Sequence, residues 1–531
     1  MTGLVALPSI LPLIAAGLSL VFGRSARAQR IISVTALTLT VVVAVWLLHQ
    51  AHNYGPQVIH IGGWTAGIGI SLVADQLAAL LLLISSIVTL FVLLYSFGQG
   101  IVVFGRETPL SVFYPTYLVL SAGVSNAFLA GDLFNLFVGF EVLLAASYVL
   151  ITLGGTEARV RSGTTYVVMA LMSSLFFLTA IAVIYAATGT VNMAELSTRI
   201  ADLPVEVQTM LQLMLLTAFG IKAAVFPLSS WLPDSYPTAP ANVTAVFAGL
   251  LTKVGVYAII RTQTLLFVET DIHELLMVTA LLTMVFGILG AVAQSDIKRM
   301  LSFTLVSHIG FMMFGVALDS PIGLTGSIYY VIHHITIQTT LFLVAGLIEI
   351  RSGTTAVDRL GGLAKSAPIM AAMFFIPAIN LAGIPPFSGF IGKLALIQGG
   401  VELGSGLSYL LVFGSIVTSL LTLYAIAKAW NRAFWQPATT DDGSEDSDTL
   451  GALYSNRAQQ HDQDVIAGEL VRNDDDILKM PRGMALPTLA LIVVGLALMV
   501  FAGPLIHLAN GAALELLDPS IYVEAMFEVV N

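Results

Sequence analysis

A succession of apolar segments, each about 18 or more residues long, constrains the fold of this chain more than any other feature. Of its 531 residues, 57% are hydrophobic and 10% charged, whereas an average soluble domain has about 25% charged residues. The mean hydropathy is +0.91. A transmembrane β-barrel would show alternating segments of about 10 residues, and these do not dominate here. The sequence therefore predicts an all-α polytopic membrane protein.

Fourteen segments are predicted to cross the membrane. They lie at residues 4–23, 31–49, 71–97, 111–130, 133–153, 163–187, 208–228, 240–262, 272–293, 301–318, 325–350, 369–398, 407–434 and 484–508. The first is similar to a signal peptide, because Ala26-Arg27-Ala28 follows it as an A-x-A pattern. Since no basic residue precedes its apolar run, we interpret it as a retained helix whose N-terminus lies outside.

The basic residues test that orientation, because cytoplasmic loops of membrane proteins are enriched in Lys and Arg. The loops predicted to be cytoplasmic contain Arg24, Arg27, Arg30, Arg106, Arg159, Arg161, Lys298, Arg299, Arg351, Arg359, Lys365, Lys428, Arg432, Arg457, Arg472, Lys479 and Arg482. The opposite loops contain only Arg199 and Arg261, and the remaining basic residues are three lysines within predicted spans. This asymmetry predicts a multi-pass protein of the cell membrane with its N-terminus outside.

One long polar segment, residues 436–482, interrupts the apolar pattern. It contains acidic runs such as Asp474-Asp475-Asp476 and few apolar residues, which is typical of a solvated, flexible loop. We predict that this loop is cytoplasmic, and docking of a partner or attraction of cations is an alternative role. Most of the excess negative charge lies in it, so the net charge of −10 is no evidence for a basic partner. No nucleic-acid partner is expected.

Charged residues within the predicted spans are the main functional signal. A charge at the centre of a bilayer costs about 2.5–3.5 kcal/mol on insertion scales, so such residues face each other or water. Glu141 follows Asp132, a predicted helix N-cap, by nine residues, which places it roughly 13–14 Å deep. Alone it would take up a proton, because burial disfavours its charged form. A neutral glutamic acid between helices is the structural alternative to a titrating one.

Lys222, Lys253 and Lys393 are the lysines within predicted spans, and Lys222 and Lys393 each lie close to a predicted helix break. Proline cannot continue a regular helix, and a broken backbone in a membrane must be buried in protein or line a watery cavity. The break positions are Pro227, Pro233, Pro237 and Pro240 in the first segment, and Pro385 and Pro386 in the second. Snorkelling to an interface is a poor explanation for three lysines this deep. We expect them to exchange protons, because desolvation favours the neutral amine.

Histidines occupy the sequence between Lys253 and Lys393. His308 and the adjacent pair His333 and His334 lie within predicted spans, and imidazole can pass protons near neutral pH. Adjacent histidines point to different faces of a helix, so we expect one of the pair to line the path. The structural alternative for each is a hydrogen-bonded core residue.

Several functions are excluded or not indicated. The chain has no cysteine, which excludes disulfides, thiolate metal sites and iron–sulfur clusters. No cofactor motif, no catalytic residue and no carboxylate-rich metal cage is visible in the sequence.

The motifs carry a resemblance that covers nearly the whole chain. Gly-Asp-Leu-Phe-Asn-Leu-Phe-Val-Gly-Phe-Glu-Val-Leu-Leu-Ala-Ala-Ser-Tyr, ending at residue 148, resembles the fifth helix of the large antiporter-like membrane subunits. Phe-Pro-Leu-Ser-Ser-Trp-Leu-Pro-Asp-Ser-Tyr-Pro-Thr-Ala-Pro is similar to their seventh-helix break, and Ile-Pro-Pro-Phe-Ser-Gly-Phe-Ile-Gly-Lys to their twelfth. This family contains the A-type and D-type subunits of the Mrp cation/proton antiporters and the proton-pumping subunits of respiratory complex I and related hydrogenases. The fifth-helix motif and the chain length are most similar to the D-type.

The resemblance implies about fourteen helices, with two inverted five-helix repeats and discontinuous helices 7 and 12. The implied division is 1–110 for helices 1–3, 111–262 and 272–434 for the repeats, 436–482 for the loop and 484–531 for the last helix and tail. It also implies an ion pair of Glu141 with Lys222, a connecting Lys253, central histidines and a terminal Lys393. Gln338 departs from the family, where many members carry a lysine, and we hypothesise that His333 or His334 takes that role.

The implied function is proton translocation in a multi-subunit Na⁺/H⁺ antiporter, with K⁺ or Li⁺ as alternative cargo. The implied partners are the large A-type subunit, small membrane subunits and the lipid bilayer. The alternatives are a subunit of a complex I-like or hydrogenase redox complex and a transporter that acts alone. In the first alternative, any redox centre lies in another subunit, because this chain has no cysteine.

Overall fold

The computed structural model describes residues 2–99, 102–103, 106–107, 110–437 and 481–528. Almost all of the predicted loop 436–482 therefore lies outside the described residues. The first half of the chain, residues 2–265, is mostly helical. Its elements are η1 Thr2–Ala6, α1 Leu7–Val21, α2 Ala26–Tyr54, β1 Gln57–His60, η2 Ile61–Gly63, β2 Ser71–Ala74, α3 Gln76–Gln99, β3 Val102–Val103, β4 Arg106–Glu107, α4 Leu110–Leu129, α5 Leu133–Thr152, α6 Glu157–Thr188, α7 Met193–Ala201, α8 Val205–Ala223, α9 Trp231–Ser235, η3 Tyr236–Thr238, α10 Ala241–Val246, η4 Phe247–Leu251 and α11 Thr252–Leu265.

The second half is also helical. Its elements are α12 His273–Ala293, α13 Ile297–Ala317, α14 Pro321–Ser352, η5 Val357–Arg359, α15 Leu363–Ser366, α16 Pro368–Ala382, α17 Ser388–Leu403, α18 Gly406–Trp430, η6 Asn431–Trp435, α21 Arg482–Val500, α22 Ala502–Leu516 and α23 Pro519–Glu528. The prediction of an all-α polytopic membrane protein is confirmed.

Twelve helices among the described residues are long and apolar enough to cross a membrane. The two predicted spans without such a helix are 208–228 and 369–398, and both contain a break. In the first, α8 ends at Ala223 and carries polar residues, including Lys222. In the second, α16 and α17 are separate short helices. The chain is a multi-pass membrane protein, and the count of fourteen crossings stays a prediction.

One predicted boundary was wrong. The span predicted to start at residue 71 begins as a strand, β2, which pairs antiparallel with β1 from Gln57 opposite Ala74 to His60 opposite Ser71. The helix α3 starts only at Gln76. The residues of β2 are all buried, so hydropathy alone did not separate the strand from the helix that follows it.

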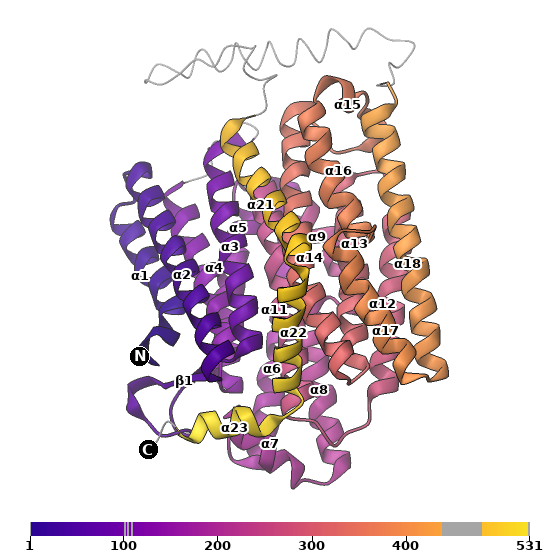
Figure 1. Ribbon diagram of the computed structural model, residues 1–531. Coiled ribbons are helices and arrows are strands. Elements are labelled where there is room, and N and C mark those ends of the chain that lie inside the picture. The colour runs from indigo at the N-terminus through magenta and orange to yellow at the C-terminus, as the bar shows by residue number, and fades with distance from the viewer. Residues whose placement is uncertain (1, 100–101, 104–105, 108–109, 438–480, 529–531) are drawn as a thin grey trace.

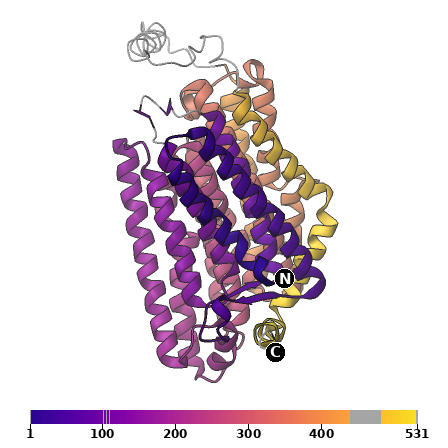
Figure 2. The same cartoon turned by 90° about the vertical axis from the view of Figure 1, so that its left-hand side faces the viewer.

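The helices differ strongly in how much of their surface is enclosed (Figures 1 and 2). In the most apolar window of α14, and of the continuous helix formed by α10, η4 and α11, every residue is buried, and in α13 94% are. In the same windows of α1, α2, α6, α12 and α18, fewer than half of the residues are buried. In Figure 1, α1 and α2 lie on one side of the molecule and α18 on the other. The enclosed helices form the core, and they carry four of the seven predicted proton-transfer residues: Lys253, His308, His333 and His334.

Two helical hairpins are built alike. In each, the second helix starts at an aspartate N-cap: Asp132 accepts a hydrogen bond from Asn135 N, and Asp296 from Arg299 N. In each, a glycine lets the two helices approach closely, with Gly139 of α5 against α4 and Gly287 of α12 against α13. This likeness agrees with two related halves.

The turns of these hairpins lie at opposite ends of the molecule. The α4–α5 turn bonds to β2 through Gly131 N and Ser71 O, at the end where β1 and α23 lie (Figure 1). The last turn of α12 accepts a hydrogen bond of 2.9 Å, at Val292 O, from Lys428 near the end of α18, at the opposite end of the molecule in Figure 1. The hairpins are therefore inverted, while the boundaries 111–262 and 272–434 stay predictions.

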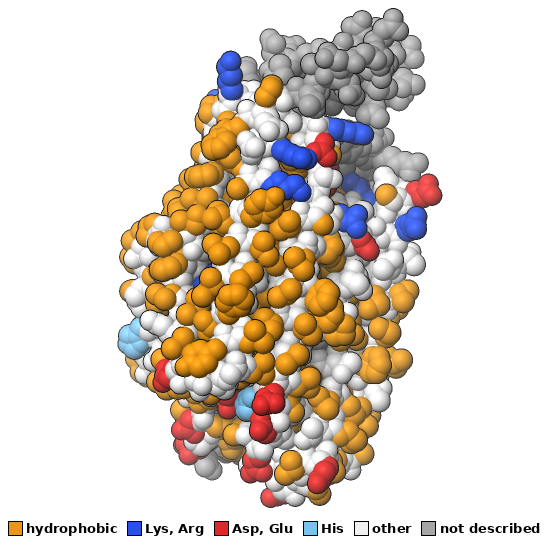
Figure 3. All heavy atoms as spheres, turned by 90° about the vertical axis from the view of Figure 1, so that its right-hand side faces the viewer, with side chains coloured by type: hydrophobic (Ala, Val, Ile, Leu, Met, Phe, Trp, Pro, Cys, Tyr) orange, Lys and Arg blue, Asp and Glu red, His pale blue; other side chains and the backbone are white. Residues whose placement is uncertain are grey.

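The molecular surface carries a broad apolar band between two differently charged ends (Figure 3). On the face shown, Lys and Arg side chains gather at the upper end and Asp and Glu at the lower end. Such a band is what a lipid bilayer covers, since the exposed apolar side chains gain nothing from contact with water.

Candidate functional site

Glu141 and Lys222 are brought together by Ser174 on α6. The Ser174 hydroxyl donates a hydrogen bond to Glu141 Oε1 and accepts one of 3.2 Å from Lys222 Nζ. The direct ion pair that the family resemblance implied is not formed: among the described residues, no oxygen–nitrogen contact within 4.0 Å joins the two side chains. We refer to Glu141, Ser174 and Lys222 as the acid–hydroxyl–lysine triplet.

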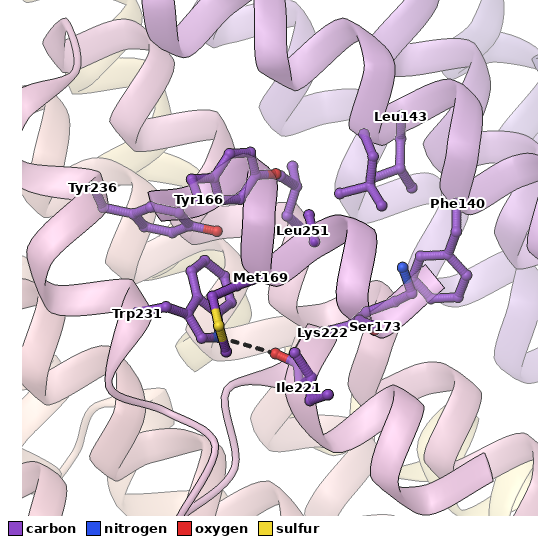
Figure 4. A pocket seen from close by; sticks show the side chains of 12 residues that line it. Phe140, Leu143, Tyr166, Met169, Ser173, Ile221, Lys222, Trp231, Tyr236 and Leu251 are labelled. Carbon is purple, nitrogen blue, oxygen red and sulfur yellow. Dashed lines mark hydrogen bonds between the residues drawn. The ribbon is translucent and has the colours of Figure 1, made fainter. Parts of the chain in front are cut away.

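The break after α8 positions Lys222. The helix ends in a left-handed residue, Ala224, and the chain then forms the short helices α9 and η3 before α10 starts. Trp231 of α9 donates a hydrogen bond of 3.1 Å to the Ile221 carbonyl, which lies in the last turn of α8 (Figure 4). The ammonium nitrogen of Lys222 lies 4.8 Å from the centre of the Phe140 ring.

A cavity opens beside the triplet. Figure 4 shows Lys222 and Phe140 on one side of it and the aromatic rings of Tyr166, Trp231 and Tyr236 on the other. The predicted break region 227–240 therefore borders a cavity, as a broken backbone in a membrane requires. Of its prolines, Pro233 lies inside the short helix α9 and the others lie outside the regular α-helices.

Lys253 is completely buried on the enclosed helix and has a backbone partner. Its Nζ donates a hydrogen bond of 2.5 Å to the carbonyl oxygen of Ala248. Ala248 belongs to η4, a single turn of π-helix, where the regular α-helical hydrogen bonds are interrupted. Gly249 in this turn allows the close approach of Thr339 on α14. No pattern in the sequence predicts the π turn.

The three histidines form one cluster between Lys253 and Lys393. His308 on α13 shares a hydrogen bond of 2.8 Å with Tyr330 OH, and its ring lies 5.3 Å from that of His334. His333 shares a hydrogen bond of 2.9 Å with Ser388 at the start of α17. His308 and His334 lie within the electrostatic range of both Lys253 and Lys393.

Four imidazole nitrogens of this cluster are buried and have no protein partner: His308 Nε2, His333 Nε2 and both ring nitrogens of His334. Gln338, which lies one turn beyond His334 on α14, donates a hydrogen bond of 2.7 Å to the Leu301 carbonyl, and its Oε1 also has no partner. Buried polar atoms without protein partners are where ordered water is expected. Both adjacent histidines are thus brought to the cluster, whereas the sequence predicted one.

Lys393 lies at the second break and satisfies the end of the helix before it. Its Nζ donates hydrogen bonds to the carbonyl oxygens of Leu381 and Ala382, at 3.3 and 3.0 Å, in the last turn of α16. Gly383, with φ +86°, allows the chain to leave this helix next to the Lys393 side chain. Pro385 and Pro386 separate α16 from α17, as predicted.

Sequence reasoning missed four contributions to the site: Ser174, Tyr330, Ser388 and the π turn. A serine or tyrosine within an apolar helix is common, so these residues carried no signal of their own. Among the residues the structure describes, no group of three or more His, Asp or Glu side chains is arranged to hold a metal ion.

These observations define a polytopic helical membrane protein with an enclosed row of titratable side chains between two broken helices. Ionisable groups in that position mark ion pathways, and proteins that move ions across membranes use discontinuous helices to build their sites. The row runs from the triplet through Lys253 and the histidine cluster to Lys393. Comparisons with known proteins agree.

Residues 130–422 match the family model described as NADH:quinone oxidoreductase/Mrp antiporter, transmembrane. The D-type subunit of the Na⁺/H⁺ antiporter of Alkalihalophilus pseudofirmus is 38% identical over 531 residues, covering 99% of this chain and 100% of the relative. A chain of the Mrp complex from Dietzia sp. DQ12-45-1b has a TM-score of 0.86 at 32% identity, with 99% of both chains covered. A chain of respiratory complex I from Thermus thermophilus has a TM-score of 0.76 at 26% identity, covering 97% of this chain and 100% of that one. The chain belongs to the family of transmembrane subunits shared by NADH:quinone oxidoreductase and Mrp antiporters.

Proposed function

We propose that this chain is the proton-translocating subunit of a multi-subunit Na⁺/H⁺ antiporter, a secondary active transporter in the cell membrane. The observation that carries the proposal is the row of titratable groups inside the helix bundle, in which Lys222, Lys253, Lys393 and the three histidines are buried. The relatives named as D-type antiporter subunits and the chain of the Mrp complex support the same function. By the same likeness, its partners are the large A-type subunit and small membrane subunits.

The proposed orientation has the N-terminus outside and the loop 436–482 in the cytoplasm. The charge distribution in Figure 3 supports it, because on the face shown Lys and Arg gather at the end of the molecule where α18 ends and α21 begins. The N-terminus and β1 lie at the opposite end (Figure 1).

The proposed mechanism is a lateral relay of charge along the row. A proton that reaches Lys222 changes its interaction with Glu141 through Ser174. A neighbouring charge changes the proton affinity of a buried group by about tenfold to thousandfold, so the next lysine and the histidines respond in turn. The membrane potential supplies about 2.3 kcal/mol per charge per 100 mV, a comparable energy. Inward proton flow then drives cation export.

The second candidate is a subunit of a redox-driven proton pump. The likeness to a complex I chain favours it, but at lower identity and TM-score than the likeness to the Mrp complex chain. In this case, proton pumping would depend on quinone reduction by partner subunits.

The test is cation-dependent proton flux in inverted vesicles from cells that lack other antiporters and express the complete gene cluster. Lys222→Ala and Lys393→Ala are each expected to reduce Na⁺-dependent flux at least about 100-fold, the usual effect of removing a proton-transfer group. Glu141→Ala is expected to do the same.

The matched control is Lys428→Ala, which removes a lysine that also donates to backbone carbonyl oxygens but lies off the row, near the end of α18. Its flux should stay near wild type, with assembly of every variant checked on native gels. Normal flux in the fully assembled Lys222→Ala and Lys393→Ala complexes would refute the relay. Proton pumping that requires quinone reduction, with no Na⁺ dependence, would establish the second candidate.

A further inference from the structure

A second buried ion cluster lies outside the row, at the outer end of the molecule. Arg261 forms an ion pair with Asp75, and the two side chains are 3% and 2% exposed. Asp75 also caps α3, accepting a hydrogen bond of 2.8 Å from Ala78 N. The sequence predicts that Arg261 lies in an outer loop. The structure corrects this, because α11 extends to Leu265 and buries Arg261 with its Nε unpartnered.

Glu515, near the end of α22, faces this ion pair. Its Oε2 accepts a hydrogen bond of 3.2 Å from Gln76 N, the first residue of α3, and its Oε1 is buried without a partner. Glu515 lies beyond the last helix that is long enough to span the membrane. Burial raises the pKa of Glu515 to about 8, and the neighbouring charge of Asp75 adds to this effect while Arg261 opposes it. The carboxyl group therefore keeps its proton at neutral pH and loses it in the alkaline range.

The surroundings of Glu515 offer few other charges. Tyr522 of α23 and Tyr257 of α11 place their rings 5.2 and 5.5 Å from the Arg261 guanidinium. His52 of α2 bonds to the Gln76 side chain, and its ring lies 6.0 Å from that of His507 on α22. Between α14 and α22, the Thr325 hydroxyl donates a hydrogen bond of 3.3 Å to Asn510 Oδ1, and neither side chain is charged.

We propose that Glu515 is a proton-binding site at the outer end of the molecule, and that its proton occupancy controls Lys253 through the Asp75–Arg261 ion pair. With Glu515 protonated, the three side chains carry no net charge. When Glu515 releases its proton to the outer water, they carry one negative charge. The net charge of this cluster therefore changes by one unit when the external pH passes through the pKa of Glu515.

The link to the row is the helix α11 itself. Arg261 follows Lys253 by eight residues, which corresponds to about 12 Å along the helix axis. At an effective dielectric constant of about 20, one unit of charge about 12 Å away changes proton affinity by about tenfold. The charge on Glu515 acts from beyond Arg261, so tenfold is the upper limit of its effect on Lys253. A deprotonated Glu515 strengthens proton binding at Lys253, and a protonated Glu515 weakens it. This inference rests on the proposed function, since it gives Lys253 a proton to exchange.

The first test measures protonation directly by infrared spectroscopy of the purified complete complex. The wild-type spectrum minus that of Glu515→Gln isolates the carbonyl band of this one protonated carboxyl group. The band is expected below about pH 8 and should disappear above it. Glu524→Gln, which removes an exposed carboxylate of α23 at the same end, should leave it unchanged. Glu515→Asp keeps a carboxyl group and should shift the midpoint, so the test survives if the glutamine variant does not assemble.

The second test measures Na⁺-dependent flux in inverted vesicles, whose interior corresponds to the outer face. The wild-type rate should change by more than about twofold, and by up to about tenfold, as the interior pH passes through about 8, and in Glu515→Gln it should change less than about twofold. An infrared difference spectrum without a titrating band overturns the proposal. An unaltered pH profile in Glu515→Gln also overturns it. If Lys222→Ala is inactive while Glu515→Gln matches wild type, this inference alone fails, and if Lys222→Ala is fully active, the proposed function fails.

Discussion

Ser174 lies between an acid and a base, and its hydroxyl group contacts both at once. A hydroxyl can donate one hydrogen bond and accept others, so it can join Glu141 to Lys222 whichever of them holds the proton. A direct ion pair would hold both charges in contact. With Ser174 between them, a small rotation of the serine side chain is enough to make or break the link between Glu141 and Lys222. The triplet is therefore better suited to repeated exchange than a closed pair.

Ser174→Ala should lower Na⁺-dependent flux about 10- to 100-fold, because the loss of a charge-assisted hydrogen bond worth about 1.5–3 kcal/mol disconnects Glu141 from Lys222. The control is Ser173→Ala, which removes the adjacent hydroxyl; that group donates to the Ala218 carbonyl and not to the triplet. Ser174→Thr keeps the hydroxyl and should recover part of the rate. Equal rates for the two alanine variants would rule out a role for the bridge.

For single residues, the sequence predicted the charged members of the site and did not predict the neutral side chains that bond to them. A lysine or glutamate within an apolar segment is costly, so Glu141, Lys222 and Lys253 stand out in the sequence without any structure. Ser174 does not, since serine is tolerated in membrane helices for many reasons. Arg261, at the edge of the predicted span 240–262, was counted with the outer loop because helix ends are the least certain part of any prediction, whereas α11 continues to Leu265 and buries it.

At each helix break, backbone carbonyl groups at the end of the first half-helix are left without helical partners, and a side chain donates hydrogen bonds to them. At the second break, the Asn380 side chain accepts a hydrogen bond from Gly389 N in the first turn of α17. Lys393 donates to the carbonyl groups at the end of α16. Two half-helices are thus held end to end by one amide and one lysine.

Gly389→Ala should destabilise this junction, because the added methyl group would overlap the Asn380 carbonyl oxygen and crowd the His333 ring. Overpacking of this kind costs about 1–3 kcal/mol. The melting temperature of the purified complex should fall. Gly17→Ala in α1 is the matched control, since its methyl group would meet no atom within 4 Å. A Gly389→Ala complex that melts at the wild-type temperature would show that the junction can relax.

The positions of the breaks were predictable, and their internal geometry was not. Single prolines are accommodated inside α1, α4, α16 and α21, but closely spaced prolines disfavour a regular helix, so both breaks lie where they were predicted. The π turn of η4 contains no residue with a special preference, and it depends on the packing of Gly249 against α14. The strand β2 was missed because its four buried residues read as the start of the apolar helix that follows it.

On the face shown in Figure 3, one end of the molecule is rich in basic residues and the other in acidic residues. The fold class and the order of most spans followed from hydropathy and the positive-inside asymmetry, because both act on the whole chain. The cluster at Glu515 was not predictable, since it joins residues from the α3 start, α11 and α22 that lie far apart in sequence.

The stability of the folded chain should depend on this cluster. The pKa of Glu515 is raised in the folded state from its usual 4.5 to about 8, so the folded form binds the proton more tightly than the unfolded form. This contribution is complete below about pH 4.5 and is lost as the pH rises through about 8. Glu515→Gln should therefore melt about 2 °C higher than wild type at alkaline pH, measured on the purified complex. Glu524→Gln should follow the wild-type curve, and a Glu515→Gln complex that melts lower than wild type at alkaline pH would contradict the prediction.

Lys253 and Lys393 both donate to main-chain carbonyl oxygens and not to acidic side chains. A main-chain carbonyl is present whatever residue occupies the position. A systematic substitution survey should therefore identify the two lysines as intolerant to change and their acceptor positions, Ala248, Leu381 and Ala382, as sensitive to side-chain size only. In the evolution of this chain, a single substitution at an acceptor position cannot remove the carbonyl oxygen that binds either ammonium group. Only a shift of a helix can separate the lysine from its acceptor.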